Sequence, residues 1–387
     1  MIRRITLALA APVLAVAVAT AVSALMLAFT DYSAAEVFKV IFTDGFSRTS
    51  LVDTVNRAAP YYIAGVAVAI GFKMNLFNIG VEGQYRLAAL FAAAAAAAVK
   101  LPAPLHVLFT FLVAMAVGAA WASIPGLLRA YRGVSEVISS IMLNATALGV
   151  AAFFLGRWLR APAEVEQTLG TRRISPSGQL PSLNGVLRAI GIDVPDATRV
   201  QSYVILAAVV GVIYYLVIWR SSYGFDLRAT GSNAEAATAS GVDAKRMVIT
   251  AMLLSGAAAG LIGLNDIMSP AARYTDVTVV SGLGFTGIAI ALLGRNNPVG
   301  IAFAALLWAF MDAVQTPLSN AELPKQITAI MQGITVLSVV IAYEVVRRVA
   351  ARQELAGLRR EVTAGGAAPP PADPPPSTGS GPEVAPA

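Results

Sequence analysis

Long stretches without a charged residue recur along the whole chain, and this pattern constrains the fold more than any other feature. The charge-free stretches cover residues 5–30, 58–72, 87–99, 101–128, 137–156, 200–219, 247–265, 277–294, 296–311 and 326–343. Hydrophobic residues make up 57% of the 387 residues and charged residues only 13%, so burial in lipid is expected. The sequence therefore predicts an all-α polytopic membrane protein with about ten membrane helices.

Three of these stretches are too short to cross a bilayer as simple helices. The stretches 58–72, 87–99 and 296–311 hold 15, 13 and 16 residues, whereas a spanning helix needs about 20. Short or glycine-broken segments at matching places in two halves of a membrane protein point to a transport pathway. We therefore expect some helices to be short or broken, and we expect a transport function.

The two halves of the chain resemble each other. Ala58–Phe72, Lys73–Arg86 and Leu87–Val99 are similar in pattern to Met247–Asn265, Asp266–Gly282 and Leu283–Gly294. A proline opens the helix that follows in each half, Pro102 in the first and Pro298 in the second. Five spans per half is an odd number, which turns the second copy upside down. The sequence thus predicts two inverted five-helix halves.

Composition excludes several classes of site. The chain has no cysteine, which excludes disulfides, thiolate catalysis and cysteine-ligated metals. The residues form no clustered catalytic set, and we predict neither a catalytic site nor a metal site. The net charge of +6 comes from basic residues scattered between apolar stretches, as expected for residues that flank membrane helices. We therefore predict the lipid bilayer, and no nucleic acid, as a partner.

The first stretch resembles a signal peptide, because Arg3 and Arg4 precede it. Its 26 residues exceed the apolar core of about 7–15 found in cleaved signals, so we expect an uncleaved first helix. With the N-terminus inside and ten crossings, both termini are expected in the cytoplasm.

The chain divides by composition into a membrane domain and a tail. Residues 1–346 are expected to form the membrane domain. Within it, 158–199 is a polar extracytoplasmic loop with several prolines, and 220–246 is the longest cytoplasmic connection. Residues 347–387 are basic at first and then rich in Pro, Ala and Gly, which predicts a disordered cytoplasmic tail.

The most polar sequence beside a short stretch runs from Asn75 to Gln84. We expect Asn78 to cap the helix that follows it and Glu82 to lie in the first turn, where the helix dipole favours a negative charge. Arg86 is placed at i+4 for an ion pair with Glu82. Two interpretations stay open: a plain cytoplasmic helix start, or a gate that contacts the substrate.

The cytoplasmic connection carries its own helix signals. Ser232 or Asn233 can cap a helix, Glu235 lies in its first turn, and Gly241 ends it. The expected product is a helix of about two turns. It either docks into another protein or is a plain connecting segment.

The sequence contains no energy source of its own. None of its five lysines, Lys39, Lys73, Lys100, Lys245 and Lys325, is followed by Ser or Thr, so a phosphate-binding P-loop is absent. A stand-alone secondary transporter would need ion-coupling residues inside a span, and the charges lie instead at the ends of the stretches. Either a partner supplies the energy or transport is passive.

Four motifs, taken in order, resemble a known family. They are Phe77–Gln84 (FNIGVEGQ), Val134–Asn144 (VSEVISSIMLN), Arg228–Ala237 (RATGSNAEAA) and Gly284–Pro298 (GFTGIAIALLGRNNP). They are similar to permease subunits of bacterial ABC importers, in the family that includes ribose, branched-chain amino acid and nucleoside permeases. The resemblance covers about residues 55 to 345. The two asparagine-containing motifs and the long external loop most resemble the nucleoside branch.

This resemblance implies the biological setting. The chain would be a transport subunit rather than an enzyme, forming the path for nucleosides in the bacterial plasma membrane, with simple sugars such as ribose as the alternative substrate. It would bind no cofactor itself, because ATP is used by a cytoplasmic ABC ATPase. A second permease chain, homologous but not identical, and an extracytoplasmic substrate-binding lipoprotein would complete the importer.

Two sets of site residues are expected, the first from the resemblance and the second from the short helices. The internal helix would be the coupling helix that seats in the ATPase, formed by Asn233, Ala234, Glu235, Ala236, Ala237, Gly241 and Val242. The short helices would place a translocation pathway at Asn75, Asn78, Glu82, Gln84, Asn144 and Phe285. The ring of Phe285 would then be available to stack on a base or another ring face.

Overall fold

The computed structural model describes residues 17–29, 32–162, 168–269, 271–275, 279–324, 326–339, 341–342, 345–346 and 348. Most of the first charge-free stretch and the tail from 349 lie outside the described residues. Within the described ranges all regular structure is helical, and the only β pairing consists of two isolated bridges, Arg160–Thr171 and Ser182–Gln201. Residues Ala19–Leu337 form one compact unit, to which the following description applies.

The helices follow one another with short connections. In chain order they are α2 (Ala34–Thr43), α3 (Arg48–Phe72), α4 (Val81–Ala98), α5 (Ala103–Arg132), α6 (Glu136–Phe154), a π-helical turn η1 (Leu155–Leu159), a 3-10 turn η2 (Pro176–Gly178), α7 (Asn184–Ala189), α8 (Tyr203–Trp219), α9 (Ser222–Ser232), α10 (Ala234–Ala239), α11 (Ala244–Gly260), α12 (Leu264–Ile267), α13 (Leu283–Leu293), α14 (Pro298–Ala313) and α15 (Gln315–Asn320). Further short apolar helices cover Ala17–Leu27 and Gln326–Val339.

The structure is that of a multi-pass membrane protein. Four helical segments of the described chain are long and apolar enough to cross a bilayer: Ala103–Arg132, Glu136–Leu159, Ala244–Ile267 and Pro298–Asn320. Helices α8 and α9 add a fifth if the 69° bend between them is counted as a break within one span. The count of ten membrane helices stays a prediction, because the remaining helices are shorter or carry charged residues.

Two of the stretches read as too short belong to longer helices. Helix α3 has 25 residues, because its first turns include Arg48, Asp53 and Arg57. Helix α4 begins at Val81 rather than at 87 and has 18 residues. Charged residues therefore lie inside these helices, and the charge-free stretches underestimate the helix lengths. Helix α14 has 16 residues, but with α15 it forms the segment Pro298–Asn320 that is long enough to cross a bilayer, whereas α13 has only 11 residues.

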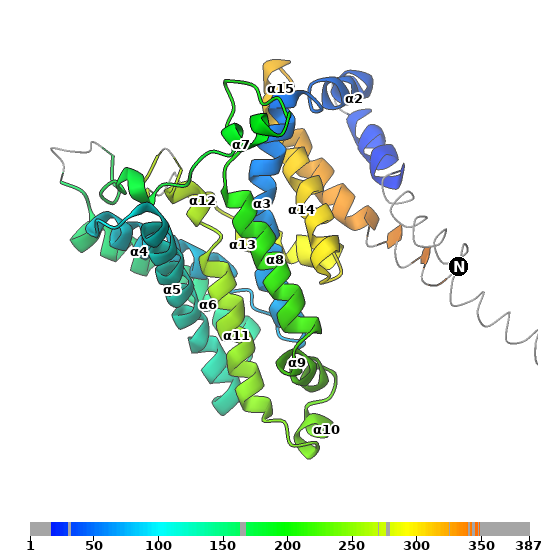
Figure 1. Cartoon of the computed structure of the whole chain (residues 1–387). Coiled ribbons are helices and arrows are strands. Elements are labelled where there is room, and N and C mark those ends of the chain that lie inside the picture. Colours follow the sequence, from blue (N-terminus) through cyan, green and yellow to red (C-terminus); the bar gives the residue numbers. More distant parts are fainter. Residues whose placement is uncertain are drawn as a thin grey trace, which may run out of the picture. The chain divides into compact units, whose positions relative to one another are not determined.

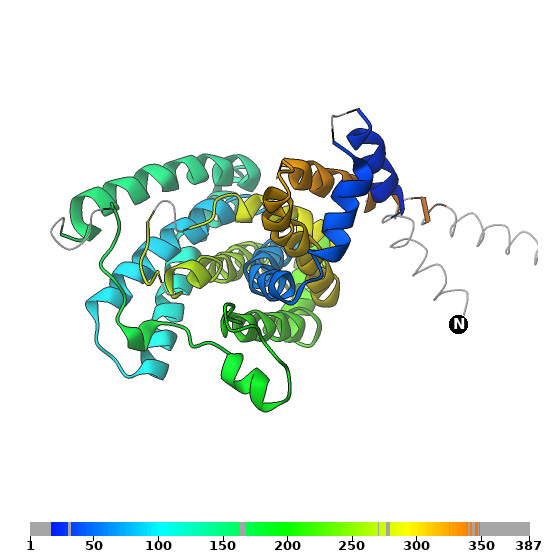
Figure 2. The same cartoon turned by 90° about the horizontal axis from the view of Figure 1, so that it is seen from above.

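Helix α3 lies at the centre of the unit, with α8, α11, α13 and α14 packed against it (Figure 2). The packing crosses between the halves. Helix α3 of the first half contacts α13 and α14 of the second, while α11 of the second half contacts α4 and α5 of the first. These contacts join the two halves closely, and the relation of the halves as inverted copies stays a prediction.

Small residues allow α5 and α11 to cross closely. A Cβ atom on Gly256 would lie 2.5 Å from the carbonyl oxygen of Gly118 and 2.3 Å from the Cβ of Ala122. A Cβ atom on Gly260 would lie 2.1 Å from the carbonyl oxygen of Ala114. Because lipid tails are as apolar as leucine, membrane helices associate through such backbone proximity rather than through hydrophobic burial.

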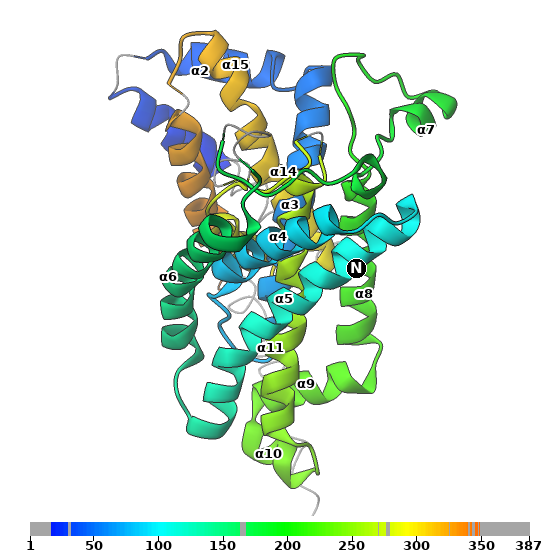
Figure 3. The ribbon, with the colours of Figure 1, turned by 90° about the vertical axis from the view of Figure 1, so that its left-hand side faces the viewer.

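The connecting segments gather at two ends of this unit. Helices α2, α7 and α15 lie at one end, and α9 and α10 at the other (Figure 1). Helix α6 lies on a flank, where it packs on α4 and α5 (Figure 3). Its side chains Ile138, Met142 and Phe153 are exposed, as expected of a face that meets lipid or another subunit.

Candidate translocation site

The chain turns back into the bundle after α3. Asn75 lies in this turn with φ at 60°, a left-handed conformation that asparagine tolerates better than most residues. The segment that follows this turn lies directly against the end of α3: a Cβ atom on Gly71 would be 2.9 Å from the carbonyl oxygen of Leu76. Helix α4 therefore begins inside the bundle rather than at its end.

Asn78 and Gln84 form a reciprocal amide pair at this point. Nδ2 of Asn78 donates to Oε1 of Gln84 at 3.0 Å, and Nε2 of Gln84 donates to Oδ1 of Asn78 at 2.9 Å. Nδ2 of Asn78 also donates to the hydroxyl of Ser255 on α11 at 2.8 Å, and Ser255 donates to the carbonyl oxygen of Ala67 on α3 at 2.6 Å. The pair joins the start of α4 to both central helices.

The capping role expected for Asn78 is wrong. Gly80 is the N-cap residue of α4, and no side chain caps the helix. The side chain of Asn78 is 1% exposed and bonds to Gln84 and Ser255 instead. Burial explains the difference, since an amide enclosed by α3 and α11 is stabilised by partners on those helices.

Glu82 connects the first turn of α4 to the start of α13. Oε1 accepts the backbone N–H of Gly282 at 2.9 Å, and Oε2 accepts the backbone N–H of Gly284 at 3.0 Å. The predicted ion pair is present, with Nε of Arg86 2.9 Å from Oε1 of Glu82. One carboxylate thus serves the positive ends of two helix dipoles, although it is only 8% exposed.

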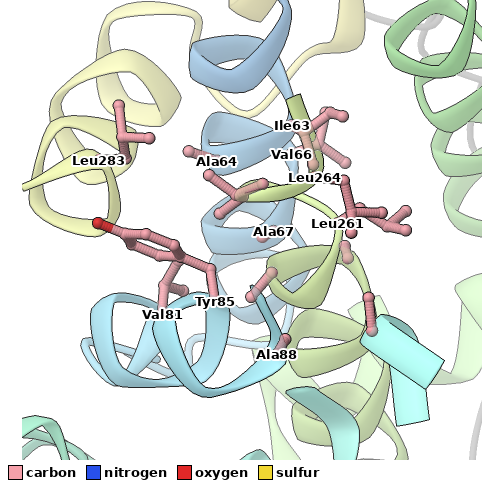
Figure 4. Close-up of a cluster of buried hydrophobic side chains, with 14 of the residues drawn as sticks. Ile63, Ala64, Val66, Ala67, Val81, Tyr85, Ala88, Leu261, Leu264 and Leu283 are labelled. Atoms are coloured by element: carbon pink, nitrogen blue, oxygen red, sulfur yellow. The ribbon is translucent and has the colours of Figure 1, made fainter. Parts of the chain in front are cut away.

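The contact between α4 and α13 is as close as backbone permits. A Cβ atom on Gly284 would lie 2.5 Å from the backbone nitrogen of Glu82. The hydroxyl of Tyr85 lies 2.9 Å from Oε1 of Glu82 and 2.7 Å from the carbonyl oxygen of Val280, and its single proton bonds to one of them at a time. Figure 4 shows Tyr85 projecting from α4 toward the helix that carries Leu283.

Asn144 on α6 bonds to the backbone at the start of α4. Its Oδ1 accepts the N–H of Gly83 at 2.9 Å, and its Nδ2 donates to the carbonyl oxygen of Ile79 at 2.9 Å. The structure therefore brings four of the predicted pathway residues together around the start of α4: Asn78, Glu82, Gln84 and Asn144. We refer to these four residues, with Gly282 and Gly284, as the junction.

The other two predicted pathway residues lie apart from these hydrogen bonds. Asn75 is exposed in the turn that precedes the junction. Phe285 is 53% exposed in the first turn of α13, one residue after the glycine that Glu82 binds. The four side chains around the start of α4 bond to protein groups, whereas the ring of Phe285 is exposed beside them.

A polar cavity that sequence reasoning missed lies on the other side of the α13 start. It has a volume of 320 Å³, and its lining residues include Asp53, Asn56, Arg57, Tyr61, Gln201, Asn265, Asp266, Val280, Leu283 and Asp312. Val280 lies in the segment that leads into α13, and Leu283 is the first residue of that helix. The sequence signal was the Asp53–Arg57 spacing inside α3, which was read as the boundary of an apolar stretch.

Comparison with known proteins identifies the family of this chain. Residues 50–340 match the model of a permease family described as the branched-chain amino acid transport system permease component. The chain belongs to this family. No solved structure matches it.

Several relatives of this permease are named as nucleoside or sugar permeases. The guanosine ABC transporter permease protein NupP of Bacillus subtilis is 32% identical over 86% of this chain and 93% of its own length. The glucose ABC transporter permease protein TsgB13 of Haloferax volcanii is 33% identical, with 86% and 87% covered. The nucleoside ABC transporter permease protein NupB of Lactococcus lactis is 29% identical, with 77% and 80% covered. Each of these organisms also has a second permease that matches this chain.

The permease carries the predicted helix in its connecting segment. Oδ1 of Asn233 accepts the N–H of Ala236 at 2.9 Å and so caps α10, and Gly241 follows the helix with φ at 89°. Asn233, Ala234, Glu235, Ala236 and Gly241 are exposed, and Val242 is half-buried. Ala237 is only 5% exposed, so it faces the chain itself and not an external partner.

Helix α9, which sequence reasoning did not separate from the loop, links α10 to the turn before the junction. A Cβ atom on Gly231, near the end of α9, would lie 2.7 Å from the Cα of Met74. The ammonium of Lys73 in the same turn lies 4.9 Å from the centre of the Trp219 ring at the end of α8. A displacement of α9 would therefore press on the segment that leads to Asn78 and Glu82.

Proposed function

We propose that this chain is the permease subunit of an ATP-driven importer of nucleosides in a bacterial plasma membrane. The observation that carries the proposal is the match to the guanosine permease NupP, which spans 86% of this chain and 93% of its relative. The nucleoside permease NupB adds support from a second organism.

Two broken helices give the chain a means of changing conformation. Helices α4 and α13 start inside the bundle, and Glu82 binds the backbone of Gly282 and Gly284 between them. A few hydrogen bonds at helix ends break and reform more readily than a packed helix moves. We infer that rearrangement at this junction opens and closes the path.

The energy would come from a separate cytoplasmic ATPase that docks on α10. The exposed residues of α10, its position at one end of the unit and the contact of Gly231 with Met74 support this assignment. The ATPase would place α9, α10 and both termini on the cytoplasmic side, and the segment around α7 on the outer side. We infer that movement of α10 reaches the junction through α9 and the turn after α3.

A second, non-identical permease would complete the membrane part. The support is that a second, more distant permease from each of the three organisms also matches this chain. An extracytoplasmic binding lipoprotein would deliver the substrate. Affinity purification of the tagged chain from its native membrane would recover an ATPase and a second permease if this composition is correct.

Uptake of labelled substrates tests the proposal directly. Deleting the gene in its native host should abolish uptake of tritiated guanosine or adenosine, while uptake of glucose and ribose continues, and the intact gene should restore it. Unchanged nucleoside uptake, in a host shown to have no second nucleoside importer, would overturn the assignment. Purified chain in lipid should hydrolyse no ATP until the partner ATPase is added.

Sugar import is the second candidate function, supported by the 33% identity to the glucose permease TsgB13. The same deletion strain separates the two functions. Loss of glucose or ribose uptake with intact nucleoside uptake would favour the sugar permease.

A further inference from the structure

The polar cavity beside the start of α13 takes its polar lining from four other parts of the chain. Helix α3 supplies Asp53, Asn56, Arg57 and Tyr61, α12 supplies Asn265 and Asp266, α14 supplies Asp312, and the segment before α8 supplies Gln201. A neighbouring cavity of 350 Å³ shares Asp53, Asn56, Gln201 and Asn265 and is also lined by Ser182 and Arg199 of the segment around α7. The two cavities therefore adjoin each other at these shared residues.

Two buried oxygens in these cavities have no hydrogen-bond donor. Oε1 of Gln201 and Oδ1 of Asn265 are buried, and no described residue donates to either of them. Asn56 differs from them, since its Nδ2 donates to the carbonyl oxygen of Arg199 at 2.7 Å and its Oδ1 accepts the N–H of Gln201 at 2.9 Å. Buried polar atoms are nearly always paired in proteins, so these two oxygens indicate a missing donor.

The charges of the lining select against anions. Three carboxylates, on Asp53, Asp266 and Asp312, line the cavity with a single guanidinium, that of Arg57. Asp312 accepts hydrogen bonds from Tyr61 and from Nε2 of Gln332. A phosphate would meet net negative charge, whereas a neutral ligand that donates hydrogen bonds would meet acceptors.

The two cavities are large enough for a small molecule. Volumes of 320 and 350 Å³ fall at the lower end of the range of about 300–1,000 Å³ found for small-molecule sites. Pro60, Val280 and Leu283 add apolar surface, on which the face of a ring can rest. Val280 also connects this site to the junction, because Tyr85 donates to its carbonyl oxygen or to Glu82.

We propose that this cavity binds the sugar ring of an uncharged nucleoside, with the side-chain oxygens of Gln201 and Asn265 accepting its hydroxyl hydrogens. The inference rests on the proposed function and names the part of the substrate that the permease itself recognises. Vicinal hydroxyls are the donors shared by nucleosides and simple sugars, so one site of this chemistry suits both kinds of relative. A bound ring would rest on Val280 and Leu283, next to the segment that Glu82 holds.

The experiment combines variants that lack a side-chain acceptor with a substrate that lacks the sugar hydroxyls. Uptake by the complete importer is measured for guanosine and for 2′,3′-dideoxyguanosine, in wild type and in the variants Gln201→Leu and Asn265→Leu. The preference of the binding lipoprotein is the same in all strains, so it cancels in the ratio between strains. Removing a hydroxyl that these oxygens bind should cost about fivefold to tenfold in the wild type, and each variant should reduce the guanosine preference by about that factor.

Controls separate this site from a general loss of folding. Thr316→Val, in a recess that contains neither Gln201 nor Asn265, should change neither guanosine uptake nor the guanosine preference. An unchanged ratio in Gln201→Leu and Asn265→Leu, with normal guanosine uptake, would overturn the inference and leave the proposed function standing. Absence of nucleoside uptake by the wild type would instead overturn the proposed function.

A second measurement needs no binding lipoprotein. Guanosine at millimolar concentration should raise the melting temperature of the purified full-length chain in detergent, and guanosine 5′-monophosphate should not. Asn265→Leu should remove the guanosine effect. An equal effect of guanosine on wild type and variant would contradict the site.

Discussion

The carboxylate of Glu82 accepts the backbone N–H of Gly284 at 3.0 Å, although the two residues are 202 positions apart in the chain. This bond joins the first turn of α4 to the first turn of α13. Glycine at 284 is required for the approach, because a Cβ atom there would lie 2.5 Å from the backbone nitrogen of Glu82. Among the contacts between the two halves of the permease, this bond is one that ties together the places where α4 and α13 begin.

Replacing Glu82 with Gln should destabilise the chain and stop transport. An amide has one oxygen where the carboxylate has two, so its NH₂ group would face the N–H of Gly282 or Gly284, and Arg86 would lose its counter-charge. Removing one partner of a buried charged network typically costs about 3–5 kcal/mol. The melting temperature in detergent should fall clearly for Glu82→Gln and stay unchanged for Glu235→Gln, whose side chain is exposed on α10. Equal melting temperatures for the two variants would show that the junction does not depend on this charge.

Gly284→Ala tests the close approach itself. Alanine normally favours a helix over glycine by about 0.5–1 kcal/mol, so a loss of stability must come from the contact with Glu82. Overpacking of this kind costs about 1–3 kcal/mol, and we expect a net loss together with reduced uptake. Gly185→Ala on α7 is the matched control, since no atom lies within 4 Å of the added Cβ and stability should stay level or rise. A stable, active Gly284→Ala variant would show that the helices can separate without consequence.

Part of the candidate site and of the connecting helix α10 could be predicted from the sequence. The i, i+4 spacing of Glu82 and Arg86 predicted their ion pair, and Asn233, Glu235 and Gly241 predicted the bounds of α10, because both depend on neighbours within one helix. The contacts of Glu82 with Gly282 and Gly284 were not predictable. They depend on which distant segment packs on α4, and local spacing contains no information on that.

The errors share a physical cause. Charged residues were treated as the ends of membrane helices, yet Asp53 and Arg57 lie inside α3 and face a polar cavity. Asn78 was assigned a cap because capping is the commonest local role of asparagine, but burial between α3 and α11 gives it tertiary partners instead. A charged residue is therefore a poor marker of a helix end in a membrane protein with a polar interior.

Docking of α10 on the ATPase can be tested at an exposed alanine. Ala237 was expected to belong to the docking face, but it is buried against the chain, so arginine there would disturb the fold instead. Ala236→Arg adds charge and bulk on the exposed side and should abolish uptake while leaving membrane insertion and melting temperature unchanged. Asn320→Arg, on the exposed surface of α15 at the other end of the unit, should retain uptake. Near wild-type uptake with Ala236→Arg would mean that the ATPase docks elsewhere.

Cysteine labelling can separate the packing residues of the junction from its accessible surface, because the chain has no native cysteine to remove. Phe285 is 53% exposed and Asn78 only 1% exposed, so Phe285→Cys should react rapidly with a small water-soluble maleimide and Asn78→Cys should not. Saturating nucleoside should slow the reaction at 285 if substrate passes that face. Met142→Cys, on the exposed flank of α6, shows how a site on the outer surface responds to the same nucleoside. Protection at 285 but not at 142 is the expected result, and equal rates with and without nucleoside at both sites would remove Phe285 from the pathway.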